Sequence, residues 1–513
     1  MTARTASGLS WFYLSTMTLM VANLTYTATV SRLLGPSAFG LMAMANLVVL
    51  FTQFFASMGL APALVQKPDL SRDEIRASST AGIAIGLACL AVVWILAPAI
   101  ATLFRQPAVV PVLRALGVSF VFTGWSMTGL GLMRRELRFR TLSLISVGTY
   151  VFAYLVVGVG LALLGAGVWS LVAASVTSTA TQAVCRYALV RHPLRPVLRW
   201  EPYREVCSYG ARLSGAYLLD YVGGNVDTFT ITRIASAAVL GQYTRAYYLV
   251  FQPLSNYLAQ ALTNVLFATL SRIQHDLGRL RRAYHSVLSL GNLMLFPACA
   301  GIAVAAQELV RVVLGPQWNL AVGLVPWFAL AGGCHVASQL TQLLADARAE
   351  LNRSLAVQTG YILGLALLIL LALRFRSHGV WVIAAAVAVA EVLRYIGYLA
   401  LARRVLALPW QRVWQAHLPA AFASAGVALA IAAARWALVG HVPTLVVFGA
   451  EAAAGVLAFA LSIRLCPLPA VRDELWMRLT AASVLGEAGG LRRRLASLVL
   501  GRPEPAAAPE ASP

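Results

Sequence analysis

The chain has 513 residues, of which 59% are hydrophobic and 12% charged, and its mean hydropathy is +0.75. Soluble domains carry about 25% charged residues, because a folded surface in water needs polar groups. This composition therefore excludes a soluble globular protein and predicts that much of the surface faces lipid. The formal net charge of +21 would indicate nucleic-acid binding in a soluble protein, but here it predicts arginine-rich loops on one face of a membrane.

The predicted elements are helices throughout. A lipid-spanning helix needs about 20 mostly apolar residues, and in hydrocarbon the backbone must satisfy its hydrogen bonds internally. The sequence therefore predicts an all-α polytopic membrane protein with about fourteen transmembrane helices. In chain order, the expected spans are Leu9–Val30, Phe39–Ala61, Ser79–Leu103, Val109–Met133, Leu142–Leu164, Val168–Leu189, Val206–Thr230, Val239–Leu262, Val287–Ala306, Ala321–Leu344, Leu355–Leu373, Val380–Ala402, Leu418–Val439 and Leu445–Ile463.

Arginines are concentrated in every second loop, which predicts that these loops and both chain termini are cytoplasmic. The stretch from Pro467 onward is expected to lie at the cytoplasmic face, as short amphipathic helices followed by a disordered Pro/Ala-rich end. The basic loops on the predicted cytoplasmic side contain Lys67, Arg72, Arg76, Arg134, Arg135, Arg138, Arg140, Arg191, Arg195, Arg199, Arg204, Arg272, Arg279, Arg281, Arg282, Arg348, Arg353, Arg403, Arg404 and Arg412.

Two sequence motifs recur in the same order about two hundred residues apart. The segment Arg32–Gly40 resembles Arg233–Gly241, and each joins the first two helices of a six-helix set. Later, Arg135-Glu-Leu137 precedes Gly167-Val-Trp169, just as Ala349-Glu-Leu351 precedes Gly379-Val-Trp381, and both pairs flank the fifth and sixth helices of their sets. With six helices per copy the two copies have the same orientation, and transporters built from such parallel repeats place substrate between the halves.

This repeat predicts four regions along the chain. Residues 1–200 form an N-terminal lobe with helices 1 to 6, and residues 201–406 form a C-terminal lobe with helices 7 to 12. Residues 407–466 add helices 13 and 14, and residues 467–513 form the cytoplasmic tail. The two parallel lobes with an added pair of helices indicate a transporter.

Polar side chains in the seventh and eighth spans are candidates for substrate or ion handling, since each ionisable group in a span costs about 2.5–3.5 kcal/mol to insert. Asp220 and Asp227 share one helical face and are candidates for ion coupling. Arg212, Asn225 and Arg245 are candidates for the substrate path. Asp227 and Arg245 are expected at the same depth, so a structural ion pair between them is the competing interpretation.

Further candidates lie in other spans. Glu391 and Arg394 are spaced i,i+3 on the twelfth span and are expected to pair, with Glu391 a candidate for ion coupling and Arg394 for substrate. Asn23 and Gln53 in the first two helices are substrate-path candidates, although polar residues also pack between helices. Glu451 in the fourteenth span shows no evident partner and lies outside the repeat.

No motif in the sequence indicates an enzyme, a bound cofactor or a metal. The six cysteines show no metal-ligand spacing. Phosphate-binding loops, HExxH and GxSxG motifs are missing. We therefore expect no catalytic residues and no cofactor, with coupling to a proton or sodium gradient as the energy source.

Several blocks of sequence resemble the Wzx-type polysaccharide flippases of the MATE-like MOP exporter superfamily, and together they cover roughly residues 5–405. They occur in the order found in that family. The blocks are Arg32–Ala43, Gly59–Lys67, Leu132–Phe139, Gly167–Trp169, Asn225–Asp227, Gly241–Tyr247, Leu266–Arg272 and Leu309–Gly315 with Trp318.

The resemblance implies two six-helix lobes, alternating access, and a polyprenyl-pyrophosphate-linked oligosaccharide as substrate. It also implies a location in the bacterial cytoplasmic (inner) membrane, contact with membrane lipids, and polysaccharide polymerase and assembly proteins as partners; nucleic acid is not expected. A peptidoglycan-precursor flippase or a multidrug exporter of the same superfamily is the nearest alternative. A membrane polysaccharide polymerase or ligase is the alternative from another class.

Overall fold

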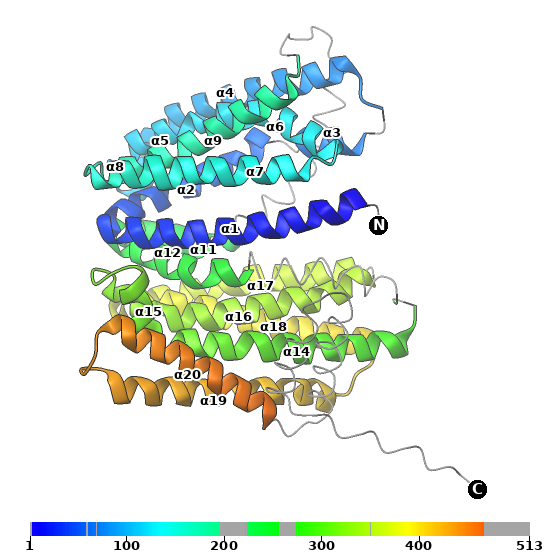
Figure 1. The fold of residues 1–513 in the computed structure, drawn as a ribbon, viewed down its shortest axis with the longest axis vertical. Helices are drawn as coiled ribbons and strands as arrows, with labels where there is room; N and C mark the ends of the chain where they lie inside the picture. Colours follow the sequence, from blue (N-terminus) through cyan, green and yellow to red (C-terminus); the bar gives the residue numbers. More distant parts are fainter. Residues whose placement is uncertain are drawn as a thin grey trace. The chain divides into compact units, whose positions relative to one another are not determined.

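The computed structural model describes residues 3–57, 60–67, 69–193, 203, 221, 223–255, 273, 275–348 and 350–465. In this part of the chain the regular elements are helices and no strand is found (Figure 1). Ten of the described helical segments are long and apolar enough to cross a membrane. The protein is therefore a multi-pass helical membrane protein, as predicted.

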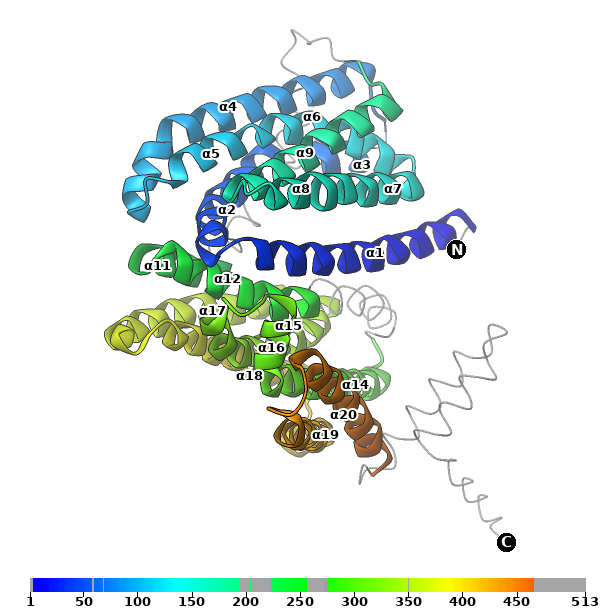
Figure 2. The same cartoon turned by 60° about the vertical axis from the view of Figure 1, so that its left-hand side comes forward.

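The described helices form two compact units. The first contains the described residues up to Arg245 together with Val313–Ala321. Its helices lie beside one another in roughly the same direction (Figures 1 and 2). They are α1 (Ala3–Leu33), α2 (Pro36–Ser57), α3 (Leu60–Gln66), α4 (Arg72–Phe104), α5 (Val109–Gly117), α6 (Ser119–Arg135), α7 (Phe139–Tyr150), the π-helix η1 (Val151–Gly158), α8 (Val159–Leu163), α9 (Val168–Val190), α11 (Val226–Ile234) and the start of α12 (Ala237–Gln252).

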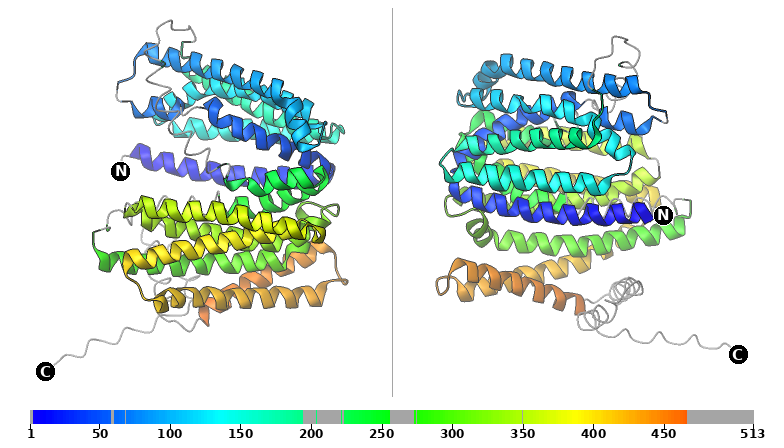
Figure 3. Two further views of the ribbon diagram at one scale, coloured as in Figure 1. Left: turned by 180° about the vertical axis from the view of Figure 1, so that it is seen from behind. Right: turned by 45° about the horizontal axis from the view of Figure 1, so that its top comes forward.

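The second unit contains Ala246–Val312 and the residues from Val322 onward, as far as they are described. Figure 3 shows these long helices from behind, with α19 and α20 at one side of the unit. Besides the end of α12, they are α14 (Leu277–Val304), α15 (Ala306–Val313), α16 (Asn319–Ala347), α17 (Leu351–Ala372), the 3-10 helix η3 (Leu373–His378), α18 (Trp381–Leu406), α19 (Trp410–Leu438) and α20 (Thr444–Arg464).

Local sequence signals explain where two of the long helices begin. Ser71 caps α4: its hydroxyl accepts from the backbone N–H of Glu74 at 3.2 Å, and the Glu74 carboxylate accepts from the Ser71 N–H at 2.9 Å. This reciprocal capping box satisfies two backbone donors that a helix start leaves open. Asp276 caps α14 by accepting from the backbone N–H of Arg279 at 2.9 Å. The third helix of each predicted six-helix set thus begins with a side-chain cap, which is a serine hydroxyl on α4 and an aspartate carboxylate on α14.

The repeated motif of the sequence produces a reciprocal close contact inside the first unit. A Cβ atom on Gly40 of α2 would overlap the carbonyl oxygen of Ala237 on α12, and a Cβ on Gly241 would overlap the carbonyl oxygen of Pro36. Gly40 and Gly241 hold equivalent places in the two copies, as do Pro36 and Ala237. The two helices therefore cross backbone to backbone, at a distance that only glycine permits at both places.

The second repeated motif also has equivalent structures in the two units. Gly167 and Gly379 have φ angles of +58° and +100°, which glycine adopts without a steric penalty. Each lies at the start of a helix, α9 or α18. The following tryptophans, Trp169 and Trp381, are both 46% exposed. The two motifs thus present an aromatic ring at the same helix position, where interfacial tryptophans are common.

The ten apolar helices do not test every predicted span. Helices α1 and α9 are 31 and 23 residues long, but among the described residues they are not apolar enough to be counted with the ten. Most of the predicted span Val206–Thr230 and the end of Val239–Leu262 lie outside the described residues, as does the tail from Pro467. The count of fourteen and the four predicted regions therefore stay predictions.

Candidate functional site

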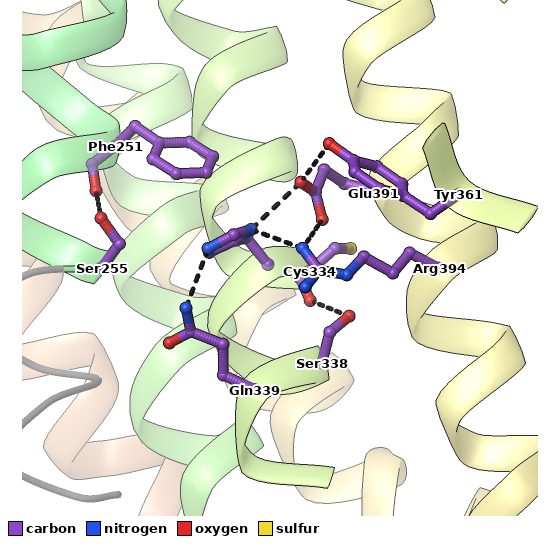
Figure 4. Close-up of polar contacts among 9 residues, drawn as sticks. Phe251, Ser255, Cys334, Ser338, Gln339, Tyr361, Glu391 and Arg394 are labelled. Carbon is purple, nitrogen blue, oxygen red and sulfur yellow. Dashed lines mark hydrogen bonds and ion pairs between the residues drawn. The ribbon is translucent and has the colours of Figure 1, made fainter. Parts of the chain in front are cut away.

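The second unit contains a buried polar cluster built from three helices, which we call the His335 cluster (Figure 4). It consists of His335 and Gln339 on α16, Tyr361 on α17, and Glu391 and Arg394 on α18. The predicted i,i+3 pair is confirmed, because Arg394 Nη1 lies 3.6 Å from Glu391 Oε2. The side chains of Glu391 and Arg394 are only 3% and 8% exposed. This is the most enclosed ion pair among the described residues.

His335 lies between the two charges of this pair. Its Nδ1 atom is 3.1 Å from Glu391 Oε1 and 3.0 Å from Arg394 Nη1. An ionised carboxylate can only accept a hydrogen bond and a guanidinium can only donate one. A protonated Nδ1 therefore bonds Glu391, whereas an unprotonated Nδ1 bonds Arg394. Whether Nδ1 carries a hydrogen therefore determines whether His335 forms a hydrogen bond with Glu391 or with Arg394.

The remaining contacts fix the cluster in place. Tyr361 donates to Glu391 Oε1 at 2.9 Å, and the Arg394 guanidinium lies 4.9 Å from the centre of the Tyr361 ring. Figure 4 shows the side chains of Tyr361, Glu391 and Arg394 directed toward one another. His335 Nε2 is 3.0 Å from Gln339 Nε2. With 18% of its side chain exposed, His335 is more accessible than Glu391 or Arg394.

The first unit contains a separate cluster of tyrosines, in which Tyr26 is buried. Asn23 donates to the Tyr150 hydroxyl at 3.0 Å, and Tyr150 stacks on Tyr154 with ring centres 4.5 Å apart. Tyr154 meets Tyr26 edge to face at 5.0 Å. Tyr154 lies on the π-helix η1, an element often found at functional sites. The substrate-path candidate Asn23 is thus part of an aromatic cluster built from α1, α7 and η1.

Arg245 and Asp227 do not form the expected pair. Asp227 is buried and accepts from the Tyr243 hydroxyl at 2.6 Å. The guanidinium of Arg245 instead lies 4.2 Å from the centre of the Phe39 ring and interacts electrostatically with Tyr26. The prediction of an Asp227–Arg245 ion pair was therefore wrong. Equal depth along two helices does not fix the direction of a side chain, and Tyr243 occupies the place beside Asp227.

The other candidates have local contacts or lie outside the described residues. Gln53 donates to the Thr123 hydroxyl at 3.1 Å and so ties α2 to α6. Asn225 donates to the Tyr221 carbonyl at 2.8 Å, just before α11 begins. Arg212 and Asp220 belong to the part of the chain that the structure does not describe. Their roles stay predictions.

Sequence reasoning missed His335, Tyr361 and Gln339. They lie on helices other than α18, so no spacing relates them to Glu391. The one available signal was a histidine in the middle of an otherwise apolar span, which is costly unless it has a function or a partner.

The described residues show no group of three or more metal-ligating side chains. The His335 cluster sets an imidazole between the two charges of a buried ion pair, and the tyrosine cluster lies near the positive charge of Arg245. Charged and polar side chains held inside a multi-pass helical bundle are typical of membrane transporters.

Comparison with known proteins identifies the family. A family model described as "Polysaccharide biosynthesis protein" matches residues 29–323. The chain belongs to this polysaccharide biosynthesis protein family. It is 23% identical over 357 residues to the lipopolysaccharide biosynthesis protein WzxC of Escherichia coli (strain K12), covering 68% of this chain and 71% of that protein. It is 25% identical over 303 residues to the succinoglycan biosynthesis transport protein ExoT of Rhizobium meliloti, covering 59% of this chain and 61% of that protein.

Solved structures share the fold. The lipid II flippase MurJ in an inward closed conformation aligns with a TM-score of 0.69 and 11% identity, over 90% of this chain and 99% of that one. An inward-facing multidrug resistance MATE family transporter of the MOP superfamily aligns with a TM-score of 0.60 and 14% identity, over 75% and 94% of the two chains. The chain therefore has the fold of MOP-superfamily transporters, as its sequence blocks implied.

Proposed function

We propose that this protein is a flippase that carries polyprenyl-pyrophosphate-linked oligosaccharide repeat units across the bacterial cytoplasmic membrane. The observation that carries the proposal is membership of a polysaccharide biosynthesis family by a chain with a MOP-transporter fold. A pyrophosphate with attached sugars cannot cross hydrocarbon unaided, because desolvating its charges costs far more than thermal energy. A helical bundle that opens alternately to each side supplies a polar path.

The described contacts support a division of roles within this function. The tyrosine cluster and the nearby Arg245 combine aromatic rings with a positive charge, a combination that suits sugars and a pyrophosphate. Arg394 is already paired with Glu391, so we assign Arg394 to the coupling machinery with Glu391 and His335. His335 Nδ1 lies within hydrogen-bonding distance of both Glu391 and Arg394, which gives this machinery two alternative hydrogen-bonding arrangements. The proposal thus takes a proton gradient as the driving force and includes neither a cofactor nor a catalytic step.

The proposal places both chain termini in the cytoplasm and treats the lipid-linked repeat unit as the principal partner. Polymerase and assembly proteins that consume the product on the outer side are expected neighbours in the membrane. The arginine-rich loops on the predicted cytoplasmic side carry much of the net charge of +21, which favours contact with anionic headgroups.

The test is deletion of the gene, followed by measurement of lipid-linked repeat units on each side of the membrane. We expect repeat units to accumulate on the cytoplasmic side and surface polysaccharide to disappear, with both restored by the wild-type gene. Accumulation of the peptidoglycan precursor, or sensitivity to cationic dyes with normal polysaccharide, would instead identify the superfamily alternatives. Repeat units that reach the outer side but stay unpolymerised would indicate a polymerase.

Coupling is tested by complementation with His335→Asn and Glu391→Gln. Both variants are expected to bind substrate but to lose the dependence of translocation on the proton gradient. Gln339→Ala, which removes a neutral neighbour of His335, is the matched control and should retain that dependence. Gradient-dependent translocation by Glu391→Gln would contradict the assigned role.

A further inference from the structure

A second buried charged group lies in the second unit where α15, α19 and α20 meet. Glu451 on α20 is 0% exposed and Glu308 on α15 is 3% exposed. The sequence indicated no partner for Glu451, but the structure places Glu308 and Arg435 beside it. These three residues form what we call the Glu451 group. None of them belongs to the His335 cluster.

The Glu451 group contains two carboxylates and one guanidinium. Arg435 Nε lies 3.4 Å from Glu308 Oε1. The same guanidinium donates to the Val304 carbonyl at 3.3 Å and to the side-chain oxygen of Gln307. The Arg435 side chain thus bonds two residues of α15 and the last residue of α14. One positive charge compensates one of the two carboxylates, and the second carboxylate is left without a cation of its own among the described residues.

The hydrogen bonding of the two carboxyl groups is incomplete when both are ionised. Glu308 Oε2 and both carboxyl oxygens of Glu451 are buried and accept from no donor in the described part of the chain. The two carboxyl groups are nonetheless close enough to interact through their side chains. Ionised carboxylates are acceptors only, whereas a protonated carboxyl can donate. A hydrogen bond between them therefore requires one proton.

The described side chains that line the cavity beside Glu451 include no hydrogen-bond donor that could take the place of that proton. Glu451 lies in the wall of a cavity of about 330 Å³ whose other described lining residues are apolar or glycine, among them Ile302, Ile431 and Phe459. The charged residues of α14 (Arg279, Arg281 and Arg282) lie near its opposite end, and its buried Cys299 faces Cys334.

We propose that Glu308 and Glu451 bind one exchangeable proton between them, which makes the junction of α15, α19 and α20 a proton-binding site separate from the His335 cluster. With the proton bound, the group has one positive and one negative charge and a carboxyl–carboxylate hydrogen bond joins α20 to α15. Loss of the proton leaves two carboxylates against one guanidinium, and their repulsion loosens α20 from α15. The proposal does not depend on the identity of the transported molecule.

Infrared difference spectroscopy on the full-length protein in nanodiscs tests the proton directly. The spectrum of wild type minus Glu451→Gln at neutral pH should contain the C=O band of a protonated carboxyl, shifted by exchange into heavy water. The Glu308→Gln difference should contain the same band. Glu136→Gln is the matched control, because the Glu136 carboxylate is half exposed and pairs with Arg138 at 2.6 Å; it should give a carboxylate band. A carboxylate band alone for Glu451→Gln overturns the proposal.

Melting temperatures separate a proton from a metal cation. A proton bound in the folded state makes the wild type less stable as pH rises and strips it, and Glu451→Gln, which mimics the protonated side chain, should lose part of this pH dependence. Exchanging choline chloride for sodium chloride at constant ionic strength should leave both melting temperatures unchanged. Stabilisation of the wild type by sodium, absent from Glu451→Gln, would show a sodium site and overturn the proposal.

Discussion

The two units use equivalent helices for different electrostatics. Helices α9 and α18 both begin within a Gly-Val-Trp motif, and the positions of Glu391 and Arg394 on α18 correspond to Thr179 and Gln182 on α9. In the first unit, Gln182 Oε1 accepts from Arg186 Nη2 at 2.7 Å. The second unit therefore has an ion pair where the first has two neutral side chains and, one turn on, an arginine.

Arg186 differs from Arg394 in the charge of its partners. It is 9% exposed and donates to Ser126 at 2.5 Å and to Gln182, both neutral, while Arg134 repels it electrostatically. Arg394 is neutralised by Glu391. From this difference we infer that the first unit keeps positive charge for an anionic substrate, whereas the second keeps a neutral group that can respond to a proton.

The largest expected effect comes from breaking the ion pair of the second unit. Glu391→Ala leaves the Arg394 charge buried, which should destabilise the protein by about 3–5 kcal/mol. The double variant Glu391→Thr/Arg394→Gln, which reproduces the α9 residues, should recover most of that stability but no proton coupling. Melting temperature and gradient-dependent translocation are the measurements. A double variant less stable than Glu391→Ala would contradict the comparison.

The next effect concerns the crossing of α2 and α12. Gly40→Ala and Gly241→Ala each force a methyl group into a backbone carbonyl, and overpacking of this kind costs about 1–3 kcal/mol or more. Both should reduce the amount of folded protein to a similar degree, as measured by size-exclusion chromatography. Gly160→Ala and Gly360→Ala add a methyl group into open space and are the controls. A marked difference between Gly40→Ala and Gly241→Ala would show that the crossing is not symmetric.

Arg186 provides a smaller test in the first unit. Arg186→Gln removes a charge without leaving an opposite charge unpaired, so its cost should be about 1–3 kcal/mol, from the unsatisfied acceptors of Ser126 and Gln182. We expect weaker substrate binding with unchanged proton coupling, the reverse of Glu391→Gln. Loss of coupling in Arg186→Gln would argue against the division between the units.

The smallest expected effect distinguishes the cap of α14, an aspartate that titrates, from the cap of α4, a serine that does not. The N–H of Arg279 stabilises the ionised carboxylate of Asp276 and lowers the pKa of this exposed side chain. A lowered pKa stabilises the fold at neutral pH, and that contribution disappears as pH falls through the lowered value. The protection factors for amide hydrogen exchange at the start of α14 should therefore fall in acid more in the wild type than in Asp276→Ser, whose hydroxyl cap, like that of Ser71 on α4, does not titrate. An equal fall in both proteins would show that the Asp276 cap contributes nothing.

The sequence predicted features that depend on a single helix, but it did not predict contacts between side chains on different helices. The length of apolar runs predicted a multi-pass helical protein, and the i,i+3 spacing predicted the Glu391–Arg394 pair, because both depend on geometry along one chain segment. The positions of His335 and Tyr361 depend on how α16 and α17 rotate against α18, which no spacing records. The same reason explains why Tyr243 rather than Arg245 holds Asp227, and why the neighbours of Glu451 were missed.

The reciprocal glycine crossing has a consequence for the evolutionary history of the chain. If the two motifs arose by duplication, each copy became part of the environment of the other, because the backbone beside Gly40 belongs to the second copy and the backbone beside Gly241 to the first. Neither copy was then free to diverge at this position, even while Thr179 and Glu391 came to differ. A substitution at this contact in one half changes the packing of the other half, so the two halves have to retain the contact together.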